Sequence, residues 1–429
     1  MKNIQSAIVL LHALIVLTAC VSATAQEFDF QIPTVEHKKI EFNGNLDAKW
    51  GLLNARHGSP FYRIQFFEDD EKRDYWSQYR LDYYFNGDYR QDKTQFVAKT
   101  FTQYSKEEPL TFSFYELYGS LNLSPKLSFG IGKKRFTWGK GYAFNPVGYI
   151  NAEKDPENPD LALAGKSAAF FSYNKSFGQN TLQNIAFTGV ILPPDAEIND
   201  KFAPAADTKI AANLYLLIND IDIDVMMYLG RDNEKRFGFD FSTNLRENLE
   251  IHSEFSYNRN DTKYVMRGSG VLPVSTNGSS YLTGIRYLNR FNTTIFVEYY
   301  HSHTGLTSHE YDDYFTFIEI ATDAGALEAV NAARAVQSGG FKQKTLMRDY
   351  LYINAKQPEP FSLLYSSFSI FTLYNLADHS FILSPRFTYT PVTDFELWLW
   401  PFFFLGNDES EYGSKQFSHK VEVWARFYF

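Results

Sequence analysis

The most constraining feature of this chain is an alternation of apolar and polar side chains that recurs from residue 40 to the last residue. In residues 40–49, IEFNGNLDAK, every even position is apolar or glycine and every odd position is polar. A period of two is that of a β-strand, whose successive side chains point to opposite faces. The pattern returns in residues 78–86, 236–242, 249–258 and 420–429, with charges in mid-strand. Repeated strands of about ten residues with a charged face favour a wall between lipid and water over a soluble sandwich.

The lengths of the expected connections give an independent indication. Short links near residues 86–88, 124–126, 178–180, 219–220, 246–248, 289–291, 357–359 and 390–392 mostly alternate with longer polar stretches at 53–73, 138–165, 193–206, 260–278, 304–344 and 405–414. Three further links, at 105–110, 231–234 and 375–378, are also short. Outer-membrane barrels have short periplasmic turns and longer external loops. The sequence therefore predicts an all-β, antiparallel, up-and-down transmembrane barrel of about 18 strands, with about 16 as the alternative and both termini in the periplasm.

The N-terminus indicates export. Lys2, an apolar core over residues 7–19 and the small residues Ala23-Thr24-Ala25 form a signal peptide, predicted to span residues 1–25. Residues 26–38 would be a short periplasmic lead, and residues 39–429 a single barrel. Leu17-Thr18-Ala19-Cys20 resembles a lipoprotein processing site, which leaves cleavage at Cys20 as the alternative to Ala25. After residue 26 no apolar run approaches the roughly 20 residues of a membrane-spanning helix.

The C-terminal strand is the most diagnostic single segment. Val421, Val423, Ala425, Phe427 and Phe429 alternate with polar or aromatic residues up to the end of the sequence. A final amphipathic strand that ends in Phe is similar to the signal by which the barrel-assembly machinery recognises its clients. Outer-membrane lipid and that machinery are therefore expected partners. The net charge of −9 and the absence of a Lys/Arg-rich run argue against nucleic acid.

The third external loop, residues 138–165, is the expected place of a constriction. It carries Glu153, Asp155, Glu157 and Asp160, and basic residues lie nearby at Lys133, Lys134, Arg135 and Lys140. Charges that line a narrow passage set the selectivity of a channel. Strict alternation also directs Lys134, Arg80, Asp82 and Glu116 toward the lumen, and these residues with Arg135 and the four acids are the predicted pore residues. A solvated outer loop rich in charge is the alternative interpretation.

Three short motifs resemble uncharacterised porin-like outer-membrane barrels. They are FYELY at residues 114–118, GIGKKRFTWG at 130–139 and FNPV at 144–147, and they cover about 35 residues with the segments between them. In that family a strand with Glu-x-Tyr precedes a Gly-Arg-Gln-type strand, a Trp-Gly pair and an Asn-Pro loop; the Lys133-Lys134 pair departs from this form. A weaker similarity is to barrels of the alginate-export type. In general porins the third loop folds into the barrel, so the resemblance implies the same for residues 138–165.

The function that these features favour is diffusion of small polar solutes across a bacterial outer membrane, without a cofactor and without catalysis. Acidic residues predominate among the expected lumen side chains, which predicts a slight preference for cations or neutral solutes. A non-conducting barrel in adhesion or an export assembly is the first alternative, and an outer-membrane hydrolase the second.

His301 and His303, two apart on a strand, are the only candidates for a metal site. Residues 324–338 are expected to form a short helix in the longest external loop. Nothing in the sequence decides the oligomeric state.

Overall fold

The computed structural model describes residues 39–68, 73–106, 109–161, 164–178, 181–193, 208–230, 233–268 and 270–429. The expected signal peptide, its two alternative cleavage sites, the periplasmic lead and most of the loop at 193–206 lie outside these residues. Residues 40–429 form one compact unit, and the description below concerns this unit.

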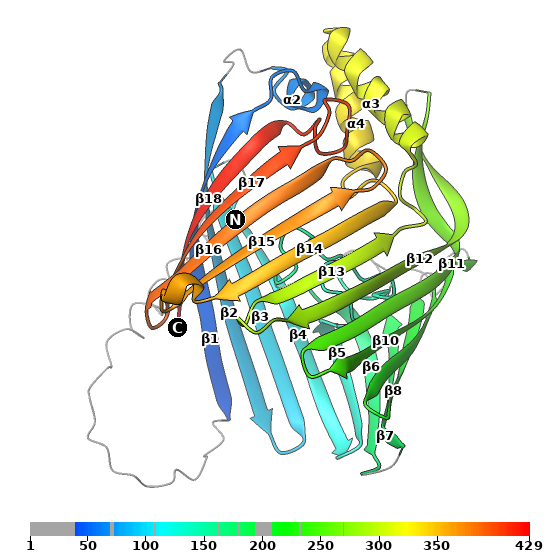
Figure 1. The fold of residues 1–429 in the computed structure, drawn as a ribbon. Coiled ribbons are helices and arrows are strands. Elements are labelled where there is room, and N and C mark those ends of the chain that lie inside the picture. Colours follow the sequence, from blue (N-terminus) through cyan, green and yellow to red (C-terminus); the bar gives the residue numbers. More distant parts are fainter. Residues whose placement is uncertain are drawn as a thin grey trace, which may run out of the picture. The chain divides into compact units, whose positions relative to one another are not determined.

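The unit is a closed antiparallel barrel of 18 strands, as the alternation and the link lengths predicted (Figure 1). Each strand pairs with its neighbours in sequence, and β18 pairs with β1 to close the ring. The strands are β1 Ile40–Ala55, β2 Tyr75–Gln91, β3 Thr94–Ser105, β4 Thr111–Ser124, β5 Leu127–Lys134, β6 Lys166–Ser176, β7 Leu182–Leu192, β8 Lys209–Ile218, β9 Ile221–Leu229, β10 Lys235–Arg246, β11 Leu249–Arg267, β12 Gly270–Leu288, β13 Thr294–His301, β14 Asp349–Pro358, β15 Ser366–Asn375, β16 Phe381–Val392, β17 Phe395–Leu405 and β18 Phe417–Tyr428.

The two faces of the wall differ in chemistry. On the outside, large apolar side chains are exposed: the exposed fraction is 64% for Phe42 and 70% for Ile131. On the inside, charged side chains such as Asp82 and Asp240 are buried. This is the arrangement of a barrel whose outer band contacts lipid. Among the described residues no helix is long and apolar enough to cross a membrane.

Links alternate in length around the barrel, and the end that carries the longer ones is called the outer end below. Two links differ from the prediction. Residues 86–88 are not a turn, because β2 continues to Gln91 and Gly87 pairs with Ala98 of β3. Residues 260–278 are not a loop either, because β11 and β12 stay paired as an extended hairpin up to Arg267 and Gly270. One face of this extension packs against the core of the helices through Met266 and Val271, so the segment lacks the lipid–water alternation of the other strands.

The seam where the barrel closes is held by buried charges on its inner face. Asp47 of β1 is fully buried and accepts two hydrogen bonds from Arg426 of β18, at 2.6 and 2.8 Å. Lys49 of β1 lies 3.5 Å from Asp47 and 2.6 Å from Asp82 of β2. Opposite charges therefore join the first two strands to the last.

Substituting Asp47 by alanine is expected to destabilise the barrel by about 3–5 kcal/mol, because it leaves Arg426 without its buried partner. Urea unfolding of the refolded protein, followed by tryptophan fluorescence, measures this loss. Arg90→Ala is the matched control, since its pair with Asp88 is largely exposed. Equal unfolding midpoints for the two variants would contradict a role of the seam in stability.

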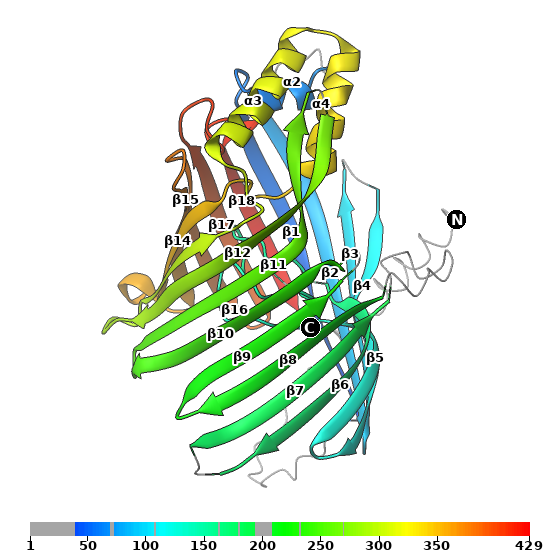
Figure 2. The ribbon, with the colours of Figure 1, turned by 90° about the vertical axis from the view of Figure 1, so that its right-hand side faces the viewer.

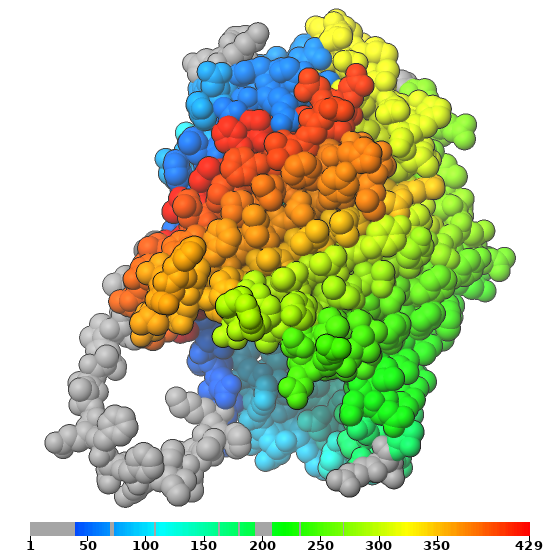
Figure 3. All heavy atoms as spheres, in the orientation of Figure 1, coloured from blue at the N-terminus to red at the C-terminus, as the bar shows by residue number. Residues whose placement is uncertain are grey.

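Helices gather at the outer end. They are α2 Pro60–Gln65 between β1 and β2, and α3 Ser308–Asp323 and α4 Leu327–Gly340 between β13 and β14 (Figures 1 and 2). The predicted helix at 324–338 corresponds to α4, whereas α3 was not predicted. Figure 3 shows these helices and the β17–β18 loop together on one rim of the barrel. Buried residues of all three helices, including Phe61, Tyr314 and Val330, share one apolar core. A 3-10 turn, η3 Pro360–Ser362, lies in the β14–β15 link.

Candidate functional site

Residues 135–161, which follow β5, cross the interior of the barrel. The backbone N–H groups of Lys140 and Gly141 both donate to Oε1 of Glu254 on β11, each at 2.6 Å. The N–H groups of Tyr142 and Ala143 donate to Glu298 on β13, the latter at 2.8 Å. β13 lies eight positions from β5 in the ring of 18 strands, which is close to the opposite wall. The loop therefore enters the lumen, as its resemblance to porin loops implied.

The Trp-Gly motif of the sequence makes this approach possible. Gly139 adopts φ 95°, a conformation that glycine tolerates best. A Cβ on Gly141 would lie 2.2 Å from the carbonyl oxygen of Phe144, so only glycine fits there. Two successive N–H groups can then point at one carboxylate oxygen, and charge-assisted hydrogen bonds of this kind are the stronger ones. Residues 139–147, called the anchored segment below, are thus fixed to buried carboxylates of the wall.

Apolar packing fixes the same loop on the near side. Phe136, Trp138, Val147 and Ile150 are buried in one cluster with side chains of β6 to β9. Asn151 returns the chain to its starting point, because its side chain bonds to both the N–H and the carbonyl group of Trp138, at 3.2 and 2.7 Å. Phe144 stacks on Tyr300 of β13 at 4.4 Å between ring centroids. The loop is therefore held against two walls of the lumen.

The remainder of the loop, residues 152–161, carries its carboxylates toward the other side of the barrel and is called the acidic segment. Asp155 lies 2.7 Å from Lys344, which follows α4. Glu157 lies 3.3 Å from Lys344 and 3.7 Å from Lys420 of β18. Although burial raises the pKa of Glu157, the two lysines lower it below its usual value. Asp160 approaches Arg386 of β16, at 3.9 Å.

The inner wall that faces the acidic segment is basic and aromatic. The guanidinium of Arg386 lies over the rings of Trp398 and Trp400 on β17, at 4.8 and 5.0 Å from their centroids. Trp398 stacks on Trp424 of β18, and Lys49 lies 3.6 Å over the centroid of Trp424. Cation–π contacts hold Arg386 without neutralising its charge, whereas Lys49 is also paired with Asp47 and Asp82. Acids on the loop thus lie against bases on β16 and β18 of the wall.

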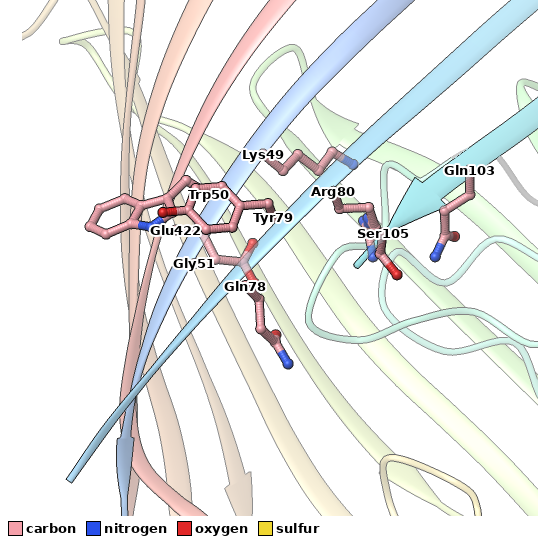
Figure 4. Close-up of a pocket in the computed structure, with 9 residues that line it drawn as sticks. All are labelled: Lys49, Trp50, Gly51, Gln78, Tyr79, Arg80, Gln103, Ser105 and Glu422. Carbon is pink, nitrogen blue, oxygen red and sulfur yellow. The ribbon is translucent and has the colours of Figure 1, made fainter. Parts of the chain in front are cut away.

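A cavity of about 180 Å³ opens beside this basic wall, on strands β18 and β1 to β3. Figure 4 shows Lys49, Arg80, Gln103 and Ser105 on one side of the strands and the ring of Trp50 on the other. Lys49 is almost fully buried, whereas the Arg80 side chain is 42% exposed beside its partner Asp82. Glu422 and Gln78 complete the polar lining. The cavity offers a polar surface, mainly of long flexible side chains, to a passing solute.

The predicted pore residues lie at several different places in the barrel. Asp155, Glu157 and Asp160 lie on the acidic segment, and Arg80 with Asp82 lies at the cavity, all facing the interior. Glu116 pairs with Lys99 at 2.6 Å and accepts the N–H of Arg135, so it holds the base of the loop. Lys134 lies over Phe170 at 4.2 Å, and Arg135 is exposed beyond the end of β5.

The basic residues that face the acids are not those expected from the sequence. Lys133, Lys134, Arg135 and Lys140 were expected to oppose the loop carboxylates, but Lys140 pairs with Asp224 of β9 at 2.8 Å. The cations that do so are Lys344, Lys420 and Arg386. Glu153, the fourth predicted acid, lines a separate cavity at the outer end. Alternation could have indicated that Arg386 and Lys420 face the lumen, but not that they face this loop.

The two histidines considered for a metal have separate partners. His301 Nδ1 lies 2.8 Å from Asp349, and its ring stacks on Tyr281. His303 bonds instead to Ser280, at 2.9 Å, and lies 3.2 Å from Asp261. Within the described part of the chain, no three potential ligands converge in a way that could hold a metal ion.

The outer rim contains one buried acid of unusual environment. Glu411, in the β17–β18 loop, is 1% exposed and accepts hydrogen bonds from Tyr350, Asn375 and the N–H of Leu346. Burial raises the pKa of Glu411 to about 7. These bonds tie the β17–β18 loop to the segment that follows α4.

Stability is therefore expected to fall as the pH rises from about 4.5 to 7, because the folded state holds the Glu411 proton more tightly than the unfolded state. The full loss would be roughly 3 kcal/mol. Glu411→Gln, which cannot ionise, should remove this part of the pH dependence. Urea unfolding midpoints of both proteins, measured between pH 4 and 8, test this prediction. Parallel curves of midpoint against pH would contradict a contribution of Glu411 to the pH dependence.

Comparisons with known proteins bear on the fold alone. No family model matches the chain, and no curated protein matches it in sequence. Among solved structures, it is similar to Pseudomonas aeruginosa OccK2 (OpdF), solved in complex with glucuronate: TM-score 0.54, 9% identity, covering 91% of this chain and 98% of that one. Its fold is that of outer-membrane barrels.

Two further barrels show the same similarity. Pseudomonas aeruginosa OpdQ has a TM-score of 0.53 at 7% identity, covering 91% of this chain and 97% of its own. Wzi of Escherichia coli is described as an outer-membrane, carbohydrate-binding barrel involved in capsule assembly. It has a TM-score of 0.52 at 8% identity, covering 91% of this chain and 84% of its own. These relationships support the barrel and leave its solute open.

Proposed function

We propose that this protein is an outer-membrane channel through which small polar solutes diffuse, narrowed by residues 135–165. The observation that carries the proposal is the loop itself, which is fixed to Glu254 and Glu298 and presents its acidic segment to a basic wall. A transverse arrangement of opposite charges orients polar solutes and disfavours apolar ones. The expected signal peptide and the exposed apolar outer face of the barrel support a location in the outer membrane.

One observation favours a second candidate, a barrel that does not conduct. The acidic segment approaches Lys420 and Arg386 to within 3.7 and 3.9 Å, so parts of the lumen are closed by ion pairs. A closed barrel would act through its outer surface, as an adhesin or in an export assembly. The cavity beside Lys49 and Arg80 favours conduction, because it leaves polar space on the wall that the anchored segment does not contact.

Single-channel recording in planar bilayers distinguishes the two candidates. The refolded full chain should give discrete, stable conductance steps in KCl, because water and ions can follow the polar wall between β18 and β3. A heat-denatured sample of the same preparation is the control for detergent artefacts. Folded protein that inserts without conductance steps would refute the channel and support the closed barrel.

A further inference from the structure

A second cavity, of about 210 Å³, lies at the outer end of the barrel. It lies between the acidic segment of the loop, the outer part of β11, the residues that follow β13 and the residues that follow α4. Its polar lining includes Glu153, Thr262, Lys263, Ser302, Gln343 and Thr345. A solute arriving from outside would meet this cavity before the basic wall.

The frame of the cavity is fixed by hydrogen bonds within the protein. The N–H of Ser302 donates to the carbonyl oxygen of Arg348 at 2.8 Å, and that of Leu306 to Leu346 at 2.8 Å. Lys263 bonds to Glu310 at 2.6 Å, and Glu310 also caps helix α3 through Thr307. The walls therefore do not depend on a ligand for their position, and a preformed site binds with less loss of entropy.

Several polar groups of the lining are left free for a ligand. Within the described residues, the side chains of Glu153, Thr262, Gln343 and Thr345 form neither hydrogen bonds nor ion pairs with the protein. The side chains of Glu153, Thr262 and Gln343 are exposed to solvent, so they are accessible to a ligand that enters from outside. Because water hydrates these groups when the cavity is empty, a ligand must offer hydrogen bonds that match those to water.

The free groups combine acceptors with donors. A carboxylate accepts, an amide and two hydroxyls both donate and accept, and the one ammonium, on Lys263, is already paired with Glu310. The rings of Tyr264 and Phe341 add apolar surface to the lining. An anion would meet Glu153, and a simple cation would leave the donors unused. A sugar ring has hydroxyls that donate and accept, together with an apolar face of C–H groups.

We infer that this cavity binds one neutral sugar ring, with Glu153 and Gln343 bonding to its hydroxyls. The inference deepens the proposed function and rests on it for the route of the solute, since it gives the channel a solute class at its outer entrance. Glu153 belongs to the acidic segment and lies two residues before Asp155, which contacts Lys344. An occupant of the cavity would therefore also lie against the loop that narrows the lumen.

Isothermal titration of the refolded full chain tests the inference, in a detergent without a sugar headgroup. The probes are the methyl glycosides of glucose, galactose and mannose, with L-lysine and acetate as charged comparators. At least one glycoside should bind, and lysine and acetate should not. Glu153→Leu and Gln343→Leu should each weaken binding about tenfold or more, whereas Glu153→Gln, which still bonds to hydroxyls, should weaken it less.

Asp312→Asn, at an exposed position of α3, is the matched control and should bind as the unaltered protein does. Heat-modifiable migration on gels checks that every variant is folded. Binding of no glycoside, equal binding by the leucine variants, or binding of lysine in place of sugars would each overturn the inference. Conductance of the same preparations is recorded separately, so a conducting protein that binds no sugar refutes this inference and leaves the channel standing.

Discussion

Deleting residues Ala152–Leu161 is expected to raise the single-channel conductance of this protein several-fold. The deletion removes Asp155, Glu157 and Asp160 with their contacts to Lys344, Lys420 and Arg386, which now bridge the lumen. Asn151 stays in place and continues to bond to Trp138, so the shortened loop can return to β6 near its start. Planar-bilayer recordings of the two refolded proteins measure the change.

A second variant separates the position of the loop from its bulk. Glu254→Gln with Glu298→Gln keeps every loop residue but weakens the charge-assisted bonds to residues 140–143. The freed loop should give noisy, fluctuating conductance rather than a uniform increase. Unchanged conductance after the deletion would contradict a constriction at the acidic segment, even if the protein conducts.

The strand count and the closure of the barrel followed from the sequence because one physical rule applies throughout the wall. A strand with lipid on one face and water on the other must alternate, and Ile40–Ala55 and Phe417–Tyr428 both do so. The rule fails where local chemistry competes with it. Asn86-Gly87-Asp88 has the composition of a turn, yet the ring of Phe42 covers Gly87 on the outer face and the strand continues.

The contents of the lumen were less predictable, since they depend on which strands face each other across the barrel. Alternation indicates that Glu254 points inward, but its partners Lys140 and Gly141 lie more than a hundred residues away. A strand pattern contains no information on such contacts. Helix α3 illustrates a different limit: Tyr311, Tyr314, Phe315 and Ile318 have helical spacing, but they are surrounded by residues that also suit strands.

Neutralising the acidic segment is expected to turn the channel toward anions. In the triple variant Asp155→Asn, Glu157→Gln, Asp160→Asn the lumen loses three negative charges. Lys420 and Arg386 on the wall and Lys344 in the segment after α4 keep their positive charges. The reversal potential in a KCl gradient should then change sign from weakly cation-selective to anion-selective. The effect should be greatest at low salt, because the Debye length is about 10 Å at 0.1 M and about 3 Å at 1 M.

Substituting the basic residues in place of the acids gives a second test, whose result does not depend on a change in the order of the loop. Lys344→Gln, Lys420→Gln and Arg386→Gln together should strengthen cation selectivity, since the acids then face an uncharged wall. Asp313→Asn, on the exposed surface of α3, removes a negative charge at the outer end and should leave the reversal potential unchanged. If both triple variants shifted the potential in the same direction, a change in pore width rather than in charge would explain them. Opposite shifts require that the permeating ions pass close to both sets of charges, which is what the proposed channel needs.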